Sequence, residues 1–274
     1  PTVESVSDRV EELLAENGRF DASKRYILYR QERTKIREQG WEMTDLQRDI
    51  YEKKYRFGDE TFEEFLDRVS GGNSKIKKLI KDKKFLPAGR ILAGRGLNER
   101  GQRVTYSNCF VIKPPLDNLE SIFDAAKKMA RTYSFGGGCG TSLGNLRPNN
   151  AKVNNSAKQT TGAVSFADLY SMTTGLIGQR NRRGALMLSM PITHPDIEEF
   201  IDLKTDLDRV TKANISVMIT DDFMRAVKND EDWTMEFKVP DTGEVIVRKA
   251  RARDIMYKLA KNNWNVAEPR LTGL

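Results

Sequence analysis

The first hundred residues carry hydrophobic side chains at the three- and four-residue spacing that one face of an α-helix requires. A first helix is predicted to end at Gly18, and a second to run over 21–39 from a cap at Asp21. Two more are predicted over 44–56 and from Thr61 onward. The front of the chain is therefore expected to be helical.

The pattern changes after residue 100. Residues 103–113 are rich in β-forming side chains and predict a strand. Two later segments, 117–133 and 164–177, each place apolar residues on one face and predict amphipathic helices. The glycine cluster at 136–140 predicts a turn, and the polar stretch at 148–161, which has no apolar period, predicts a loop.

The remaining residues alternate between strand and helix patterns. In chain order they predict a strand over 185–192, a helix over 195–203, a strand over 213–219, a helix over 222–228, a hairpin of 234–239 with 244–249 around Asp241-Thr242-Gly243, and a helix over 252–264. This alternation favours an α/β architecture behind the helical front end.

Composition restricts the class of protein. Hydrophobic residues make up 38% of the 274 positions and charged residues 31%, which is typical of a soluble globular chain. No apolar run approaches the roughly 20 residues of a membrane span, and the first ten residues lack the features of a secretory signal. Two cysteines, Cys109 and Cys139, cannot make a disulfide framework, so a reducing, cytoplasmic compartment is expected.

The chain has 46 Lys and Arg residues against 39 Asp and Glu, a formal net charge of +7. Such an excess suits nucleic acid as well as a pocket for nucleotide polyphosphates. The most basic stretch, Lys75 to Lys84, lacks the interleaved aromatic residues that stack on bases, so a solvated face is the better interpretation. Nucleic acid is therefore not the expected partner.

Four local features carry candidate chemistry, each with a plain structural alternative. The glycines at 136–140 let backbone N–H groups approach an anion, but they match no phosphate-loop motif, and a simple turn is equally consistent. Arg182 and Arg183 suit a loop that grips phosphates, or a solvated basic loop. His194, the only histidine, lacks partners for a metal or a catalytic triad and is expected to be structural. Cys109 lies in an apolar strand, where a buried, inert thiol is the default.

Eight sequence blocks, taken in order, resemble the large subunits of ribonucleotide reductases. They are FLPAGRILAG (85–94), SNCFVI (107–112), DNLESIFD (117–124), GGGCG (136–140), NLRP (145–148), TGAVSFADLYS (161–171), RRGALM (182–187) and HPDIEEFI (194–201). Their wording is closest to the adenosylcobalamin-dependent class II members, with a class I (diiron) large subunit as the runner-up.

The resemblance implies a fold and a division into domains. Residues 1–40, in which 19–37 resemble the closing helix of an ATP-cone, would form a helical segment. Residues 41–100 would form the helical N-terminal reductase region. Residues 101–274 would form the first part of a ten-stranded α/β barrel, with its dimer helices and specificity loops. The last residues, 270–274, depart from the family's wording.

The family's chemistry implies roles for several of these residues. It uses a thiyl radical and a pair of redox cysteines that reduce the 2′ position of a ribonucleotide. The resemblance places Cys109 as the first member of that pair and gives Cys139 no role. Ser107, Asn108 and Gly138 would line the substrate pocket. The radical cysteine and the second redox cysteine would come from a C-terminal portion, so the chain alone is expected to be inactive.

The resemblance also implies a site for a deoxynucleoside triphosphate effector at a dimer interface. Asp117 would meet the nucleoside end of the effector and Arg147 its phosphates. Residues 148–160 resemble the first specificity loop, and 179–184 resemble the second. The residues implied at the site are Asp117, Arg147, Lys152, Arg182 and Arg183.

The implied partners are a ribonucleotide substrate, the C-terminal portion of the reductase, and a dithiol reductant such as thioredoxin. A homodimer would form through the helices at 117–133 and 164–177. Adenosylcobalamin is the expected cofactor, bound mostly by the C-terminal portion, and no metal site or membrane is expected. The alternative is a non-catalytic module that binds deoxynucleotides and dimerises. Half of a split gene, a shortened chain and a degraded remnant are each consistent with this sequence.

Overall fold

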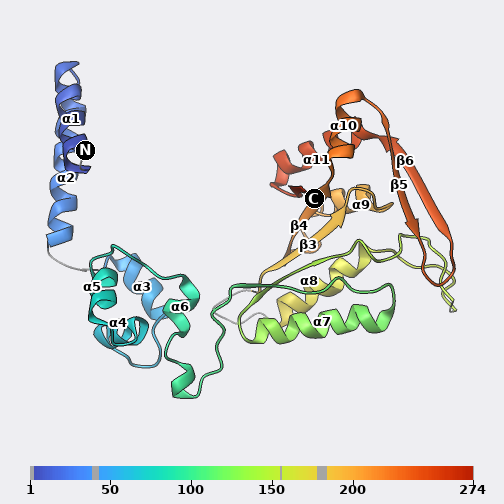
Figure 1. Ribbon diagram of the computed structural model, residues 1–274, viewed down its shortest axis with the longest axis horizontal. Helices are drawn as coiled ribbons and strands as arrows, with labels where there is room; N and C mark the ends of the chain where they lie inside the picture. The colour runs from blue at the N-terminus through green and yellow to red at the C-terminus, as the bar shows by residue number, and fades with distance from the viewer. Residues whose placement is uncertain (1–2, 39–42, 155, 178–183, 274) are drawn as a thin grey trace. The chain divides into compact units, whose positions relative to one another are not determined.

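The computed structural model describes residues 3–38, 43–154, 156–177 and 184–273. The chain divides into two compact units, residues 1–102 and 103–274. Figure 1 shows the helices and strands of both units. None of the helices in the described ranges is both long and apolar enough to cross a membrane.

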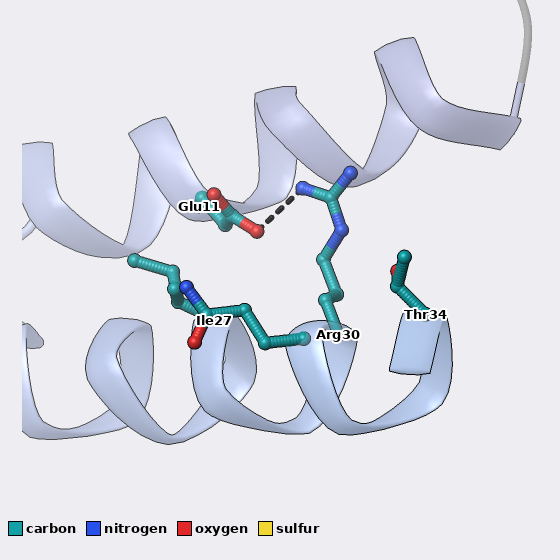
Figure 2. A pocket seen from close by; sticks show the side chains of 5 residues that line it. Glu11, Ile27, Arg30 and Thr34 are labelled. Carbon is teal, nitrogen blue, oxygen red and sulfur yellow. Dashed lines mark hydrogen bonds and ion pairs between the residues drawn. The ribbon is translucent and has the colours of Figure 1, made fainter. Parts of the chain in front are cut away.

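The first unit begins with two helices, α1 (Val3–Glu16) and α2 (Phe20–Glu38), which lie side by side. Arg30 of α2 donates to the carboxylates of Asp8 and Glu11 on α1, and Figure 2 shows the contact with Glu11. Charge therefore helps to hold the two helices together. A groove of about 610 Å³ beside this contact is lined by Glu11, Ile27, Arg30, Gln31 and Thr34.

Further helices of the first unit are α3 (Asp45–Lys54), α4 (Phe62–Ser70), α5 (Ser74–Lys81) and α6 (Gly89–Gly94), followed by a short 3-10 helix, η1 (Asn98–Arg100). Capping boxes at Thr44 and Thr61 begin α3 and α4. The buried Arg68 pairs with Glu60 at 2.7 Å and ties α4 to its neighbours. The apolar core of this region is Tyr51, Phe65, Leu66, Val69 and Ile80.

The second unit is built on a five-stranded parallel sheet in the order β1-β2-β3-β4-β7. Its strands are β1 (Cys109–Val111), β2 (Gly138–Ser142), β3 (Leu186–Pro191), β4 (Ala213–Ile219) and β7 (Arg270–Gly273). Its helices are α7 (Leu119–Ser134), α8 (Ser165–Ile177), α9 (Ile197–Asp202), α10 (Asp221–Asn229) and α11 (Ala252–Val266). An antiparallel hairpin of β5 (Asp232–Lys238) and β6 (Val245–Arg251) projects from it (Figure 1).

The two faces of the parallel sheet differ, because side chains alternate along each strand. The buried face, which packs on α7 and α8, carries Cys139, Leu186, Leu188, Met190, Ala213, Ile215 and Val217. The other face carries small and polar residues together with two methionines and a proline, namely Gly138, Gly140, Ser142, Met187, Ser189, Pro191, Asn214, Ser216, Met218 and Thr272. The described strands do not close a barrel, and we call this second face the open face.

Helices α7 and α8 pack against each other along one edge of the unit (Figure 1). The Tyr170 hydroxyl donates to the Ile122 carbonyl at 3.1 Å, and Tyr133 and Thr174 join their hydroxyls at 3.0 Å. These buried contacts fix the register of the two helices. Their outward sides keep large apolar residues exposed, namely Leu119, Phe123, Met172 and Leu176.

The predicted α/β architecture behind a helical front end is confirmed. The helices and strands predicted between 164 and 264 occur with ends within two residues of those expected. The predicted helix over 117–133 begins at Leu119, because Asn118 caps it and accepts from the N–H of Ser121. Residues 148–161, where described, form the predicted loop, with one bridge between Lys152 and Gln159.

Two sequence predictions about the sheet are wrong. The strand expected over 103–113 is limited to Cys109–Val111, because β1 is an edge strand that pairs with β2 over three residues only. The glycine cluster at 136–140 is not a turn throughout, since Gly138 begins β2. A Cβ atom there would lie 3.2 Å from both the Cβ and the carbonyl oxygen of Ala185, so glycine permits close pairing of the strands.

Candidate functional site

A cavity of about 410 Å³ lies in the second unit beside Arg147, a volume typical of small-molecule sites. It is bounded by the start of α7, the loop after Arg147, the start of α8 and the turn of the β5–β6 hairpin. Its lining residues are Asp117, Asn118, Leu119, Ile122, Arg147, Val153, Asn154, Ala157, Gln159, Thr160, Thr161, Phe166 and Asp241.

Arg147 is buried, and three residues accept hydrogen bonds from its guanidinium. Nε donates to Asp117 at 2.8 Å, one terminal nitrogen donates to Asp241 at 2.9 Å, and the other donates to the Lys152 carbonyl at 2.6 Å. Burial alone would lower the pKa of Arg147, but the hydrogen bond to Asp241 and the charge of Asp117 outweigh it and raise that pKa. The guanidinium is therefore held charged and in one orientation.

The segment His194-Pro195-Asp196 holds the backbone around Arg147 in place through hydrogen bonds. His194 is buried, and its Nε2 lies 2.8 Å from the Leu146 carbonyl, while Nδ1 accepts from the N–H of Asp196. The carbonyl can only accept, so the neutral ring carries its proton on Nε2. Burial lowers the pKa of His194 and keeps the ring neutral. Asp196 in turn accepts from the N–H of Asn149 at 2.9 Å. The expectation that His194 is structural is thus confirmed.

The β5–β6 hairpin contacts the loop that follows Arg147 (Figure 1). Arg248, on its inner face, pairs with the buried Asp196 at 3.1 Å. At its turn, Asp241 meets Arg147, and the Glu244 carboxylate accepts from the N–H of Lys152 at 3.0 Å. The hairpin therefore completes one wall of the cavity.

The cavity lining combines apolar and polar side chains. Leu119, Ile122 and Phe166 supply apolar surface, and Thr160 and Thr161 supply hydroxyls. The N-terminal end of α7, a helix of 16 residues, also lines the cavity, and its dipole favours an anion there. A ligand with an apolar part and an anionic part matches this combination of residues.

The residues assigned to the substrate pocket lie together at the start of β1 and β2. The carbonyl of Asn108 accepts from the N–H of Gly138 at 2.7 Å, and Cys109 pairs in register with Gly138. Ser107 and Asn108 are exposed. The structure thus brings Ser107, Asn108, Cys109 and Gly138 to one end of the sheet.

The two cysteines differ in a way that corrects one expectation. Cys109 is exposed and not buried, because it lies on an edge strand. Cys139 is buried on the opposite face of the sheet, and burial raises the pKa of its thiol. A buried thiol of raised pKa is a poor nucleophile, so the exposed Cys109 is the better candidate for redox chemistry. Both cysteines are free thiols.

Two residues predicted for the effector site cannot be placed in this geometry, and one residue of the cavity was not predicted from the sequence. Arg182 and Arg183, proposed for the effector site, lie outside the described residues. Among the described residues no group of three His, Cys, Asp or Glu side chains could hold a metal ion. Asp241 was recognised only as part of a turn. The Asp-Thr-Gly turn signal locates it in a hairpin, but its contact with Arg147 spans 94 residues and has no local signal.

Comparison with known proteins gives a consistent result. Residues 107–272 match the family model described as ribonucleotide reductase, barrel domain, so the match includes residues 270–272, which the sequence blocks had left out. The chain is 34% identical over 220 residues to the vitamin B12-dependent ribonucleoside-diphosphate reductase of Thermoplasma acidophilum, covering 77% of this chain and 28% of the relative.

Two further relatives extend the comparison. The enzyme of the same name from Mycobacterium tuberculosis (strain CDC 1551 / Oshkosh) is 29% identical over 282 residues, covering 91% of this chain and 40% of the relative. The ribonucleoside-diphosphate reductase large subunit of Monkeypox virus is 29% identical over 163 residues, covering 57% of this chain and 21% of the relative. The chain thus spans less than half the length of the curated relatives it matches.

Proposed function

This chain belongs to the ribonucleotide reductase family, and we propose that the cavity beside Arg147 binds a deoxynucleoside triphosphate that regulates the reductase. The observation that carries the proposal is the orientation of one buried cation, Arg147, at the edge of a cavity that also offers apolar, hydroxyl and amide side chains. Arg147 would hold phosphate oxygens, and Phe166 with its apolar neighbours would face the base. Asp117 retains lone pairs that can accept from a sugar hydroxyl.

We propose that the open face of the sheet contributes to ribonucleotide reduction. Cys109 would serve as one of two thiols that each give one electron and one proton, so that the 2′-hydroxyl leaves as water and the thiols become a disulfide. The second thiol cannot be Cys139, which lies on the buried face of the sheet. It would come from another part of the reductase, and a dithiol such as thioredoxin would restore both thiols.

Adenosylcobalamin is the cofactor that the names of the relatives suggest, and we assign most of its binding to parts of the reductase outside this segment. When bound, it supplies the radical that activates a thiol. The residues of this chain fit a reaction of that kind, because Cys109 is exposed beside Gly138, which has no side chain to obstruct a substrate. The substrate is proposed to be a ribonucleoside di- or triphosphate in the cytoplasm.

A homodimer through α7 and α8 is part of the same proposal. The apolar side chains of Leu119, Phe123, Met172 and Leu176 are exposed along these two helices, and a second copy would cover them. Leu119 also lines the cavity, so dimerisation and effector binding would influence each other.

Calorimetry with thymidine triphosphate and inorganic triphosphate tests the effector site. We expect the nucleotide to bind more tightly, and Arg147→Ala to weaken it by roughly ten- to a hundredfold, because a charge-assisted hydrogen bond contributes about 1.5–3 kcal/mol. Arg147→Lys, which keeps the charge but not the planar fork, should give an intermediate loss.

The matched control is Arg209→Ala, which removes the same charge from a half-exposed pair with Asp168 outside the cavity. It should leave nucleotide affinity within about twofold of the parent chain, since an exposed pair contributes little. Equal affinity for both ligands, unaffected at Arg147, would contradict the proposed site.

A further inference from the structure

The turn of the β5–β6 hairpin places a carboxylate where an anionic ligand would bind. Asp241 lies in the cavity lining and accepts from a terminal nitrogen of Arg147 at 2.9 Å. It occupies a donor that a phosphate oxygen would otherwise use. The same guanidinium already serves Asp117 through Nε, so two carboxylates share one cation.

The two carboxylates differ in burial, and this decides which one can leave. The Asp117 side chain is 7% exposed, and it also accepts from the backbone N–H of Arg147 at 3.0 Å. The Asp241 side chain is 44% exposed. Water can rehydrate an exposed carboxylate at little cost, whereas a buried one that loses its partner pays a large desolvation penalty. Asp241 is therefore the displaceable partner.

The electrostatic balance points the same way. Arg147 carries one positive charge against the two carboxylates, so this group is net negative before any ligand arrives. A triphosphate brings several further negative charges and meets like-charge repulsion until Asp241 moves away. The resting site is thus closed by an internal anion.

We propose that Asp241 is an affinity-determining residue of the nucleotide site, an internal anion that competes with the ligand's phosphates for Arg147 and that ligand binding displaces. This inference rests on the proposed effector function and adds the hairpin turn to it. The consequence is that the β5–β6 hairpin senses occupancy. Its turn has one contact that the ligand breaks, at Asp241, and one that the ligand leaves in place, from Lys152 N–H to Glu244.

The test is the affinity of the Asp241→Asn chain for thymidine triphosphate, for inorganic triphosphate and for thymidine, measured by calorimetry with and without Mg²⁺. We expect both triphosphates to bind about three- to tenfold more tightly than to the parent chain, because the competing charge is gone. Thymidine, which has no phosphate, should bind with unchanged affinity. Glu236→Gln, on the outward side of the same hairpin, is the control with equal charge change and should shift triphosphate affinity by less than about twofold.

A double-mutant cycle tests whether Asp241 acts through Arg147. In an Arg147→Lys background, Asp241→Asn should change triphosphate affinity by less than about half of the factor seen in the parent chain, because the two residues act through one contact. Unchanged or weaker triphosphate binding by Asp241→Asn would overturn the inference. Weakening confined to Mg²⁺-containing solution would instead identify Asp241 as a metal ligand, which also overturns it.

The outcomes separate this inference from the function on which it rests. If the parent chain binds thymidine triphosphate through Arg147 but Asp241→Asn does not tighten it, only the role of Asp241 is lost. If the parent chain shows no preference for the nucleotide and no dependence on Arg147, the effector site itself is contradicted and the inference falls with it.

Discussion

The loop around Arg147 and the strand ends around Cys109 belong to one unit, but they are built in opposite ways. Around Arg147 the two carboxylates and the Lys152 carbonyl accept from the guanidinium, and His194 and Asp196 hold the backbone of Leu146 and Asn149 on either side of it in the sequence. Around Cys109 the side chains are exposed on a three-residue edge strand. The charged groups of the first region find their partners within this chain, whereas the side chains of the second region are exposed.

The difference between the two regions suits the two roles proposed for them. An effector site must hold its charged groups in position before the ligand arrives, and a buried network does so. A reaction site must admit a substrate and a second thiol, and an exposed edge allows both. The difference is open to measurement, because buried networks and exposed strand ends respond differently to substitution.

The largest expected effect is at the buried cation. Arg147→Ala leaves the Asp117 carboxylate, 7% exposed, without its partner and should lower the free energy of unfolding by about 3–5 kcal/mol. Urea denaturation of Arg147→Ala and of Arg209→Ala measures the contrast, and the exposed pair should cost less than about 1 kcal/mol. Similar losses in both variants would contradict the contrast between the regions.

The next effect concerns two glycines of β2 that face the open side of the sheet. Gly138→Ala places a Cβ 3.2 Å from two atoms of Ala185 and should destabilise the fold by about 1–3 kcal/mol. Gly140→Ala meets its neighbour Met187 at an ordinary 3.8 Å and should change stability by less than about 0.5 kcal/mol. Thermal melting of both variants decides it, and equal costs would show that close strand approach is not the reason for glycine at 138.

A smaller effect follows from His194. Burial lowers its pKa below the ordinary 6.5, so the unfolded chain binds the proton more readily than the folded chain. Stability should be fully present above pH 6.5 and decline as the pH falls below it, with a slope of at most about 1.4 kcal/mol per pH unit. Urea midpoints between pH 7.5 and 5 measure this decline. His194→Gln, which retains a donor toward Leu146 but does not titrate in this range, should flatten it.

The smallest expected effect is at Cys109. Because its side chain is exposed, Cys109→Ser should change the free energy of unfolding by less than about 0.5 kcal/mol. A thiol reagent such as Ellman's reagent should titrate one cysteine in the native parent chain and two in urea. In Cys109→Ser the native signal should vanish. Release of two equivalents from the native chain would contradict the burial of Cys139.

Periodicity and turn chemistry predict most of this fold. The amphipathic helices α7 and α8 and the strands β3 and β4 follow from local patterns, because each buries one face. The glycines of β2 gave a wrong prediction. A glycine cluster usually indicates a turn, but here glycine allows a neighbouring strand to approach closely. The exposure of Cys109 was not predicted either, because an apolar sequence does not reveal that its strand lies at an edge.

The site divides in the same manner. Asp117 and Arg147 are found through the resemblance to the family, and in the structure Arg147 Nε lies 2.8 Å from an Asp117 carboxylate oxygen. All the proposed roles remain predictions, namely those of Ser107, Asn108, Cys109, Asp117, Gly138, Arg147, Lys152, Arg182 and Arg183. Asp241 and Arg248 could not be found from the sequence, because the hairpin meets the loop only through contacts that bridge fifty or more residues.

The alternation of side chains along β2 has a consequence for how this gene can change. Each residue of the strand belongs either to the buried face, as Cys139 does, or to the open face, as Gly138 does. Insertion of a single codon within 138–142 would move the strand residues on one side of it to the opposite faces, so that small residues enter the core and larger side chains reach the open face. Changes of length within β2 should therefore be purged among descendants of this gene.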